Sequence, residues 1–181
     1  MTHDRPHYVR KTAGQRLTVS QTVQHRPFLQ RVMVWGCFCW KRTGPLSVVT
    51  GTMRASNYRE TLESCLLPQI NRRYGTRLCK FQQNNAPCHK AIAIRNFLQQ
   101  QRFQVMEWPP YSPDMSPIEN LWAIVKRRIH STAIHTKAEL IIRLKEVWAS
   151  PEIQESCRSL IESMPRRVEA LCDNKGGPTK Y

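Results

Sequence analysis

The sequence predicts a mixed α/β fold that ends in a helical extension. Apolar stretches at residues 31–40 and 45–51 have the composition of β-strands. A strand, a helix and another strand follow over residues 77–108, and amphipathic helices occupy most of the chain after residue 117. This order, strands first, then a strand–helix–strand unit, then a run of helices, is typical of a layered α/β domain.

The two opening strands form a predicted hairpin. RVMVWGCFCW is rich in β-branched and aromatic residues, KRTG supplies turn chemistry, and PLSVVTG is the second strand. Ser56 or Asn57 can cap the next helix, whose apolar residues recur at helical spacing until Pro68. We expect that helix to stop at the proline and to restart over residues 70–74.

The strand–helix–strand unit surrounds a polar turn. RLCKFQQ, residues 77–83, is the predicted third strand, and NNAP then offers an Asn cap and a proline for the next helix. FQVMEW, residues 103–108, alternates like a half-buried strand. The helix between them is expected to turn four residues inward: Ala91, Ile94, Phe97 and Leu98.

A proline-locked loop, PPYSPDMSP, leads into the strongest helical pattern of the chain, residues 117–130. Ser116, Pro117 and Glu119 spell a capping box, in which the Glu119 carboxylate reaches back to the start of the helix. Asp114 is interpreted as a turn residue of the loop. Two further helices are predicted over residues 137–149 and 152–172, and the second should be interrupted or bent at Pro165.

Charge points to a polyanionic partner. The 181 residues include 28 Lys and Arg against 13 acidic residues, a formal net charge of +15 spread along the chain. Nucleic acid is favoured over a membrane surface, because no helix combines a broad apolar face with a lysine-rich opposite one. No apolar run approaches the roughly 20 residues of a membrane span, and the first ten residues are too polar for a secretory signal, so an intracellular protein is expected.

The seven cysteines include no CxxC pair of zinc-site spacing. Reduced and mostly buried thiols are therefore predicted, and Cys88 beside His89 is not interpreted as a zinc site. All five tryptophans stand in apolar patterns, which favours core positions over base stacking. They are Trp35, Trp40, Trp108, Trp122 and Trp148.

Several blocks in fixed order resemble the catalytic domain of Tc/mariner superfamily transposases, which belong to the ribonuclease-H-like integrase class. They are VMVWGCF, GPL, FQQ-x-NAP-x-H, EWP-x-x-SPD-x-x-PIENLW, and the ending SLIESMPRR with KGGPTKY. The resemblance implies a ribonuclease-H-like mixed sheet over residues 29–130, a helical extension over 131–174 and a disordered tail over 175–181. Residues 1–28 are interpreted as a polar segment with a remnant hairpin. The family's first central strand is missing, so its neighbours lose ladder partners unless residues 1–23 fill the gap.

The resemblance also implies the chemistry of a cut-and-paste DNA transposase. Three carboxylates of the family hold two Mg²⁺ or Mn²⁺ ions against the scissile phosphate, a task that needs hard anionic oxygens on rigid elements. The first Asp has no counterpart here, since Asp4 lies in a loop motif. The second falls at Asn84, whose amide lacks the negative charge, and only Glu119 matches the third carboxylate and metal ligand.

Several basic residues are candidates for DNA contact. His89 opens a helix beside the site and could contact a phosphate, although a solvated histidine at a helix start fits equally well. The other candidates would give salt-dependent, sequence-independent affinity, and solvated helix faces are the competing interpretation. They are Lys126, Arg127, Arg128, Arg166 and Arg167.

The sequence thus predicts a transposase catalytic-domain fragment that binds DNA and is impaired in metal-dependent strand cleavage and transfer. The alternative is a non-catalytic DNA-binding or dimerising remnant. Expected partners are DNA and either a second copy or a full-length transposase, and the expected location is the nucleus.

Overall fold

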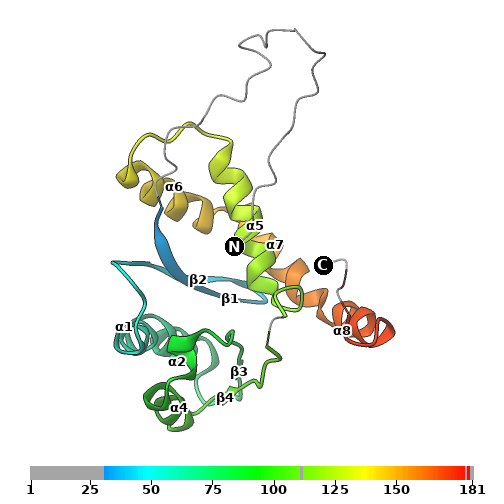
Figure 1. Cartoon of the computed structure of the whole chain (residues 1–181). Coiled ribbons are helices and arrows are strands. Elements are labelled where there is room, and N and C mark those ends of the chain that lie inside the picture. Colours follow the sequence, from blue (N-terminus) through cyan, green and yellow to red (C-terminus); the bar gives the residue numbers. More distant parts are fainter. Residues whose placement is uncertain (1–30, 111, 178, 180–181) are drawn as a thin grey trace, which may run out of the picture.

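A computed structural model describes residues 31–110, 112–177 and 179 (Figure 1). The segment interpreted as a remnant hairpin, residues 1–28, lies outside the described residues. The domain boundaries proposed from the sequence stay a prediction. Within the described part no helix is both long and apolar enough to cross a membrane.

The first two strands form the predicted hairpin. β1 (Met33–Cys39) pairs antiparallel with β2 (Arg42–Val49), with a register shift between Gly36 and Phe38. Successive side chains of β1 point to opposite faces, as the pleat requires. Val34 and Phe38 pack into one hydrophobic cluster, while Trp35 and Cys37 pack into another. The hairpin therefore separates two cores, with α1, α2 and α4 below it and α5, α6 and α7 above it in Figure 1.

The first helical segment does not stop at Pro68, contrary to the sequence prediction. α1 (Ala55–Thr61) continues through a π-helical turn, η1 (Leu62–Leu66), directly into α2 (Leu67–Tyr74). The wider π turn lies just before the proline, and Pro68 falls in the first turn of α2, where a missing backbone N–H costs little. The buried residues of the segment are Tyr58, Leu62 and Leu66.

The strand–helix–strand unit is present with shorter elements than predicted. β3 (Lys80–Phe81) pairs parallel with β4 (Gln104–Val105), and α3 (Pro87–Lys90) and α4 (Ile92–Gln99) lie between them in the chain. Ala91 has extended backbone angles, so the predicted single helix is two. Of the four expected inward residues, Ile94, Phe97 and Leu98 are buried.

Four helices complete the fold where the sequence predicts three: α5 (Pro117–His130), α6 (Lys137–Ala149), α7 (Pro151–Glu162) and α8 (Met164–Asp173). The break near Pro165 falls between α7 and α8. Leu121, Val125, Trp148 and Ile153 lie in the core that α5, α6 and α7 share. Trp40 contradicts the prediction of a core tryptophan, because it is 42% exposed. Its Nε1 donates to Glu162 Oε1 at 3.0 Å, and the Arg158 guanidinium lies 4.7 Å from its ring centroid.

The predicted single mixed sheet is divided. In the described residues β1 pairs only with β2 and β3 only with β4, so two separate two-stranded sheets result. No described strand lies between β1 and β3. The family's first central strand is expected between β1 and β3, where the described residues have no ladder.

Candidate functional site

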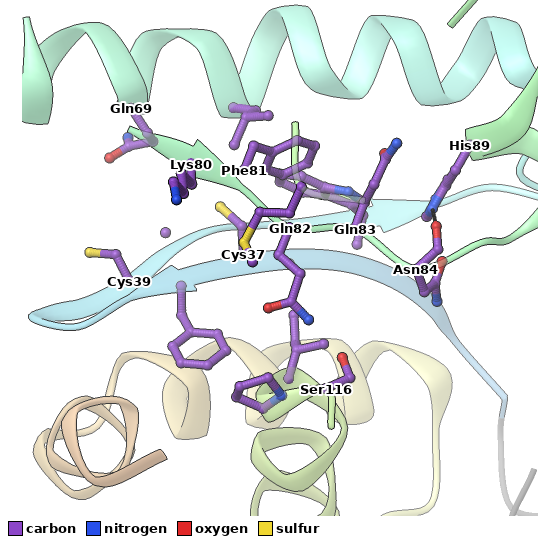
Figure 2. A pocket seen from close by; sticks show the side chains of 18 of the residues that line it. Cys37, Cys39, Gln69, Lys80, Phe81, Gln82, Gln83, Asn84, His89 and Ser116 are labelled. Carbon is purple, nitrogen blue, oxygen red and sulfur yellow. Dashed lines mark hydrogen bonds between the residues drawn. The ribbon is translucent and has the colours of Figure 1, made fainter. Parts of the chain in front are cut away.

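A groove of about 800 Å³ lies between the two sheets and the start of α5 (Figure 2). Every residue of β1 lines it, as do Cys79 to Asn84 of the β3 segment. Ser116 to Glu119 line it from α5. The structure therefore brings Asn84 and Glu119 to one groove, although 34 positions of sequence lie between them.

Asn84 stands in the turn between β3 and α3, and its side chain holds that turn. Its Oδ1 accepts a hydrogen bond from the backbone N–H of Ala86 at 3.2 Å, an Asx-type contact two residues along the chain. The neighbouring Asn85 donates from Nδ2 to the carbonyl of Trp108 at 2.7 Å, which ties the turn to the segment after β4. Asn84 itself is exposed.

Glu119 lies in the first turn of α5 and is exposed. Ser116 and Pro117 occupy the predicted N-cap and first positions, but the predicted capping box is wrong because no hydrogen bond reaches the cap side chain. The backbone N–H of Glu119, which the box would use, donates instead to the Ser116 carbonyl at 3.1 Å. Among the described residues no partner holds the Glu119 carboxylate, so it is available to a ligand.

His89 is fixed beside Asn84. Its ring stacks on Tyr58 with centroids 3.9 Å apart, and its Nδ1 lies 3.0 Å from the Asn84 carbonyl oxygen. Tyr58 in turn donates to Gln83 Oε1 at 2.6 Å. Burial lowers the pKa of His89, and the hydrogen bond to Asn84 opposes this only in part. A neutral imidazole is thus favoured here, and a role in DNA contact stays a prediction.

The lowered pKa of His89 predicts a pH-dependent stability. In the unfolded chain the imidazole takes up a proton near pH 6.5, whereas in the folded chain it does so only at lower pH. The unfolded state therefore binds more protons in that window, and the free energy of unfolding should fall as pH drops from about 7.5 to about 5. Urea unfolding of the chain across this range measures it. His89→Phe should flatten the dependence, whereas His130→Phe, at an exposed position, should leave it in place.

The basic candidates divide into exposed and buried residues. Lys126, Arg127 and Arg128 are exposed at the C-terminal half of α5, and Arg166 is exposed on α8. Their contact with DNA stays a prediction.

Arg167 is only 2% exposed. Its guanidinium donates to the Asp114 carbonyl and to Asn120 Oδ1, both at 2.6 Å, and to Ser163 Oγ at 2.8 Å. This burial argues against a direct contact between Arg167 and DNA, which stays a prediction. Its long-range bonds instead join α8 to the loop before α5 and to the first turn of that helix.

Arg73 is a groove residue for which the sequence offers no signal. Its Nη1 donates to Cys39 Sγ at 2.8 Å and its Nη2 to the Thr43 carbonyl at 3.0 Å, so the hairpin holds the guanidinium at the groove. Burial alone would raise the pKa of Cys39, but backbone hydrogen bonds from Lys41 and Arg42, and the charge of Arg73, lower it overall.

The described lining of the groove contains one carboxylate. Glu119 is the one carboxylate among its described lining residues, which also include the cations Arg73 and Lys80. No group of three or more His, Cys, Asp or Glu side chains in the described part is arranged to hold a metal ion. Two closely spaced divalent cations need several anionic oxygens, and the amide of Asn84 supplies only a neutral one.

Comparison with known proteins identifies the family. The model of the DDE superfamily endonuclease family matches residues 1–141. The chain is 38% identical over 150 residues to the transposase of transposable element Tcb1 from Caenorhabditis briggsae, covering 83% of this chain and 54% of that protein. It is 33% identical over 177 residues to the Tc1 transposase of Caenorhabditis elegans, covering 96% and 63%. The chain thus spans little more than half the length of these relatives.

Solved structures share the fold. The catalytic domain of the Mos1 mariner transposase superposes with a TM-score of 0.72 at 19% identity, covering 82% of each chain. Mos1 in its paired-end complex with the left transposon end gives 0.78 at 22% identity, covering 97% of this chain and 52% of that one. The ribonuclease-H-like fold expected from the sequence is confirmed. With its characteristic blocks in order, the chain belongs to the DDE superfamily endonucleases, among the Tc/mariner transposases.

Proposed function

We propose that this chain acts in DNA transposition as a DNA-binding transposase domain whose metal-dependent strand cleavage and transfer are impaired. Family membership supports the transposition role, and the net charge of +15 supports DNA as the partner. Mos1 has been solved with Mn, with Mg and as a strand transfer complex, which makes divalent cations and DNA ends the reagents to test here. A nuclear location is part of the same proposal.

The impairment rests on one observation, which is that the groove presents Glu119 and Asn84 where two anionic ligands are needed. A divalent cation at this place would supply Lewis acidity to a phosphate oxygen. A single free carboxylate gives weak electrostatic attraction, and Arg73 and Lys80 oppose it. The chain's own residues therefore favour retention of DNA over its hydrolysis.

The test uses DNA that carries inverted-repeat ends. The purified chain should retain this DNA in a manner that weakens steeply with salt, and it should produce no nicks in Mg²⁺ or Mn²⁺. Cleavage that depends on the cation and disappears in Glu119→Gln would overturn the impairment. Failure to retain DNA at low salt would overturn the DNA-binding role.

Asn84→Asp should increase the affinity for Mn²⁺ by on the order of tenfold, about 1.4 kcal/mol, because it adds a second negative charge to the groove. The turn should survive, since a carboxylate oxygen can accept the Ala86 hydrogen bond as the amide does. Isothermal titration calorimetry measures the affinity directly. Asn96→Asp is the matched control, because Asn96 is exposed on α4 and does not line the groove. Equal effects of the two changes would show that total charge, not position, is responsible.

The second candidate function is a non-catalytic DNA-binding or dimerising remnant. The exposed residues Lys126, Arg127 and Arg128 favour it, since three adjacent cations at the end of α5 need no catalytic site to hold phosphates. The two functions differ in the Asn84→Asp variant. Nicking gained by that variant supports an impaired enzyme, and DNA retention without any nicking supports the remnant.

A further inference from the structure

A hydrogen bond joins the segment after α8 to the loop before α5. Thr179 Oγ1 donates to the Asp114 carboxylate at 2.9 Å, across 65 positions of sequence. Asp114 belongs to the block SPD and Thr179 to the ending KGGPTKY. Neither residue is among the described lining of the groove, so an effect of this bond on the groove passes through the residues between them and it.

The backbone after α8 has the shape that this contact needs. Lys175 and Gly176 have positive φ angles of 49° and 81°, and the Gly176 N–H donates to a carbonyl in the last turn of α8 at 2.9 Å, as in a Schellman turn. A Cβ added at Gly177 would lie 2.9 Å from Asn174 Nδ2, which favours glycine there as well. The two glycines of the ending therefore direct the chain toward the loop before α5.

Asp114 is held through its backbone as well as its side chain. Thr179 donates to the carboxylate, and Arg167 Nη1 donates to the carbonyl at 2.6 Å. The same Nη1 donates to Asn120 Oδ1 at 2.6 Å, and Asn120 follows Glu119 in the first turn of α5. α8 lies beside the start of α5 in Figure 1. The chain is thus tied to α8 and its following segment on both sides of Glu119.

The five peptide bonds from Asp114 to Glu119 form a stiff connection. Pro113 and Pro117 restrict the backbone, and Ser116 is only 5% exposed. The Ser116 N–H donates to the Pro113 carbonyl at 3.0 Å, and the Glu119 N–H donates to the Ser116 carbonyl at 3.1 Å. A displacement of Asp114 would therefore move the first turn of α5, which lines the groove from Ser116 to Glu119.

We propose that Thr179 is a positioning residue of the groove, whose bond to Asp114 fixes the loop before α5 and with it the direction of the Glu119 carboxylate. A hydroxyl that donates to a carboxylate makes a stronger bond than a neutral pair does, which suits it to hold a chain segment in place. Release of the segment would leave the groove with all its residues but without a fixed carboxylate. The use of that carboxylate rests on the proposed function, whereas its positioning needs neither DNA nor a cation.

Hydrogen–deuterium exchange of the full chain, followed by NMR, tests the proposal. Thr179→Val keeps the shape of the side chain without its donor, and it should speed exchange about tenfold at the Ser116 and Glu119 amides and leave α6 unchanged. Thr179→Ser keeps the donor and should exchange like the unaltered chain. Thr61→Val is the matched control, because it removes a hydroxyl that donates to the Asn57 carbonyl within α1, and both amides should keep their rates.

A second measurement follows the Glu119 carboxylate itself. In a chain with ¹³C-labelled glutamate, the carboxyl signal of Glu119 is the one that disappears in Glu119→Gln. Thr179→Val should shift and broaden this signal, and Thr179→Ser should restore it. In an Asp114→Ala background the acceptor is absent, so Thr179→Val should have no further effect on the signal or on the amide rates.

Three outcomes would overturn the proposal. They are unchanged amide rates in Thr179→Val, equal acceleration in Thr179→Ser, and acceleration that extends equally to α6, which would mean a general loss of stability. Failure of the chain to retain DNA would overturn the proposed function and leave the amide rates as expected, so the two failures are distinguishable.

Discussion

Arg167→Met is expected to lower the free energy of unfolding by about 3 kcal/mol. The side chain is buried, and the change leaves the Asp114 carbonyl and Asn120 Oδ1 without the guanidinium that now donates to each at 2.6 Å. Partly buried acceptors left without a donor cost more than the net value of the bonds they made. Loss of the hydrogen bond to Asn120 should also loosen the first turn of α5, which contains Asn120 and the neighbouring Glu119. Urea unfolding followed by circular dichroism gives the free energy.

Arg166→Met is the matched control. Arg166 precedes Arg167 in the same helix and is exposed, so its replacement should change the free energy of unfolding by less than about 0.5 kcal/mol. Arg167→Lys should behave more like Arg167→Met than like the control, because one ammonium group cannot reproduce the spread of guanidinium donors. Similar small losses in all three variants would contradict the structural role of Arg167.

The two adjacent arginines show what residue pattern alone does not predict. Arg166 and Arg167 carry the same charge in the same helix, and local pattern treats them alike. Arg167 is distinguished by Asn120 and Asp114, which lie 47 and 53 positions away in the chain. Arg73 was missed for the same reason, since Cys39 is 34 positions from it. Contacts over such distances depend on packing that residue periodicity does not encode.

Helices were predicted best because their signals are local. α5 and α6 have the predicted bounds, for each combines an apolar stripe with a residue suited to its N-cap, Ser116 and Thr136. The Thr136 side chain accepts a hydrogen bond from the Glu139 N–H, whereas the Ser116 side chain accepts none from its helix. The residue type at each N-cap therefore predicted where the helix begins but not which hydrogen bonds form there. The helix break predicted at Pro68 was wrong, because a π turn precedes the proline and the helix continues into α2.

Strands were predicted less well because their length depends on partners. The stretch 77–83 has strand composition throughout, yet only Lys80–Phe81 forms a ladder, with β4 on one side and the groove on the other. For the site, the family resemblance selected Asn84 and Glu119, and the fold brings both to one groove. Their ligand roles stay predictions, which the Mn²⁺ titration of Asn84→Asp would decide.

Trp148→Ala is expected to lower the free energy of unfolding by about 4 kcal/mol. Trp148 is 4% exposed, stacks on Trp122 with centroids 4.7 Å apart, and donates from Nε1 to the Gly44 carbonyl at 2.9 Å. It therefore fastens α6 to the β1–β2 hairpin. Trp40→Ala, at a tryptophan that is 42% exposed, should cost about 1 kcal/mol in the same urea titration.

The coupling of Trp148 to Gly36 gives a sharper test of this contact. A Cβ added at Gly36 would lie 2.9 Å from Trp148 Cζ2 and 3.1 Å from the Trp122 ring, so Gly36→Ala should cost about 2 kcal/mol by overpacking. In a Trp148→Ala background the clash with Trp148 is gone, and the same change should cost at least about 1 kcal/mol less. Because glycine has no side chain to remove, this non-additivity can come only from the space that the indole fills. Additive losses would mean that the Trp148 ring does not press on β1.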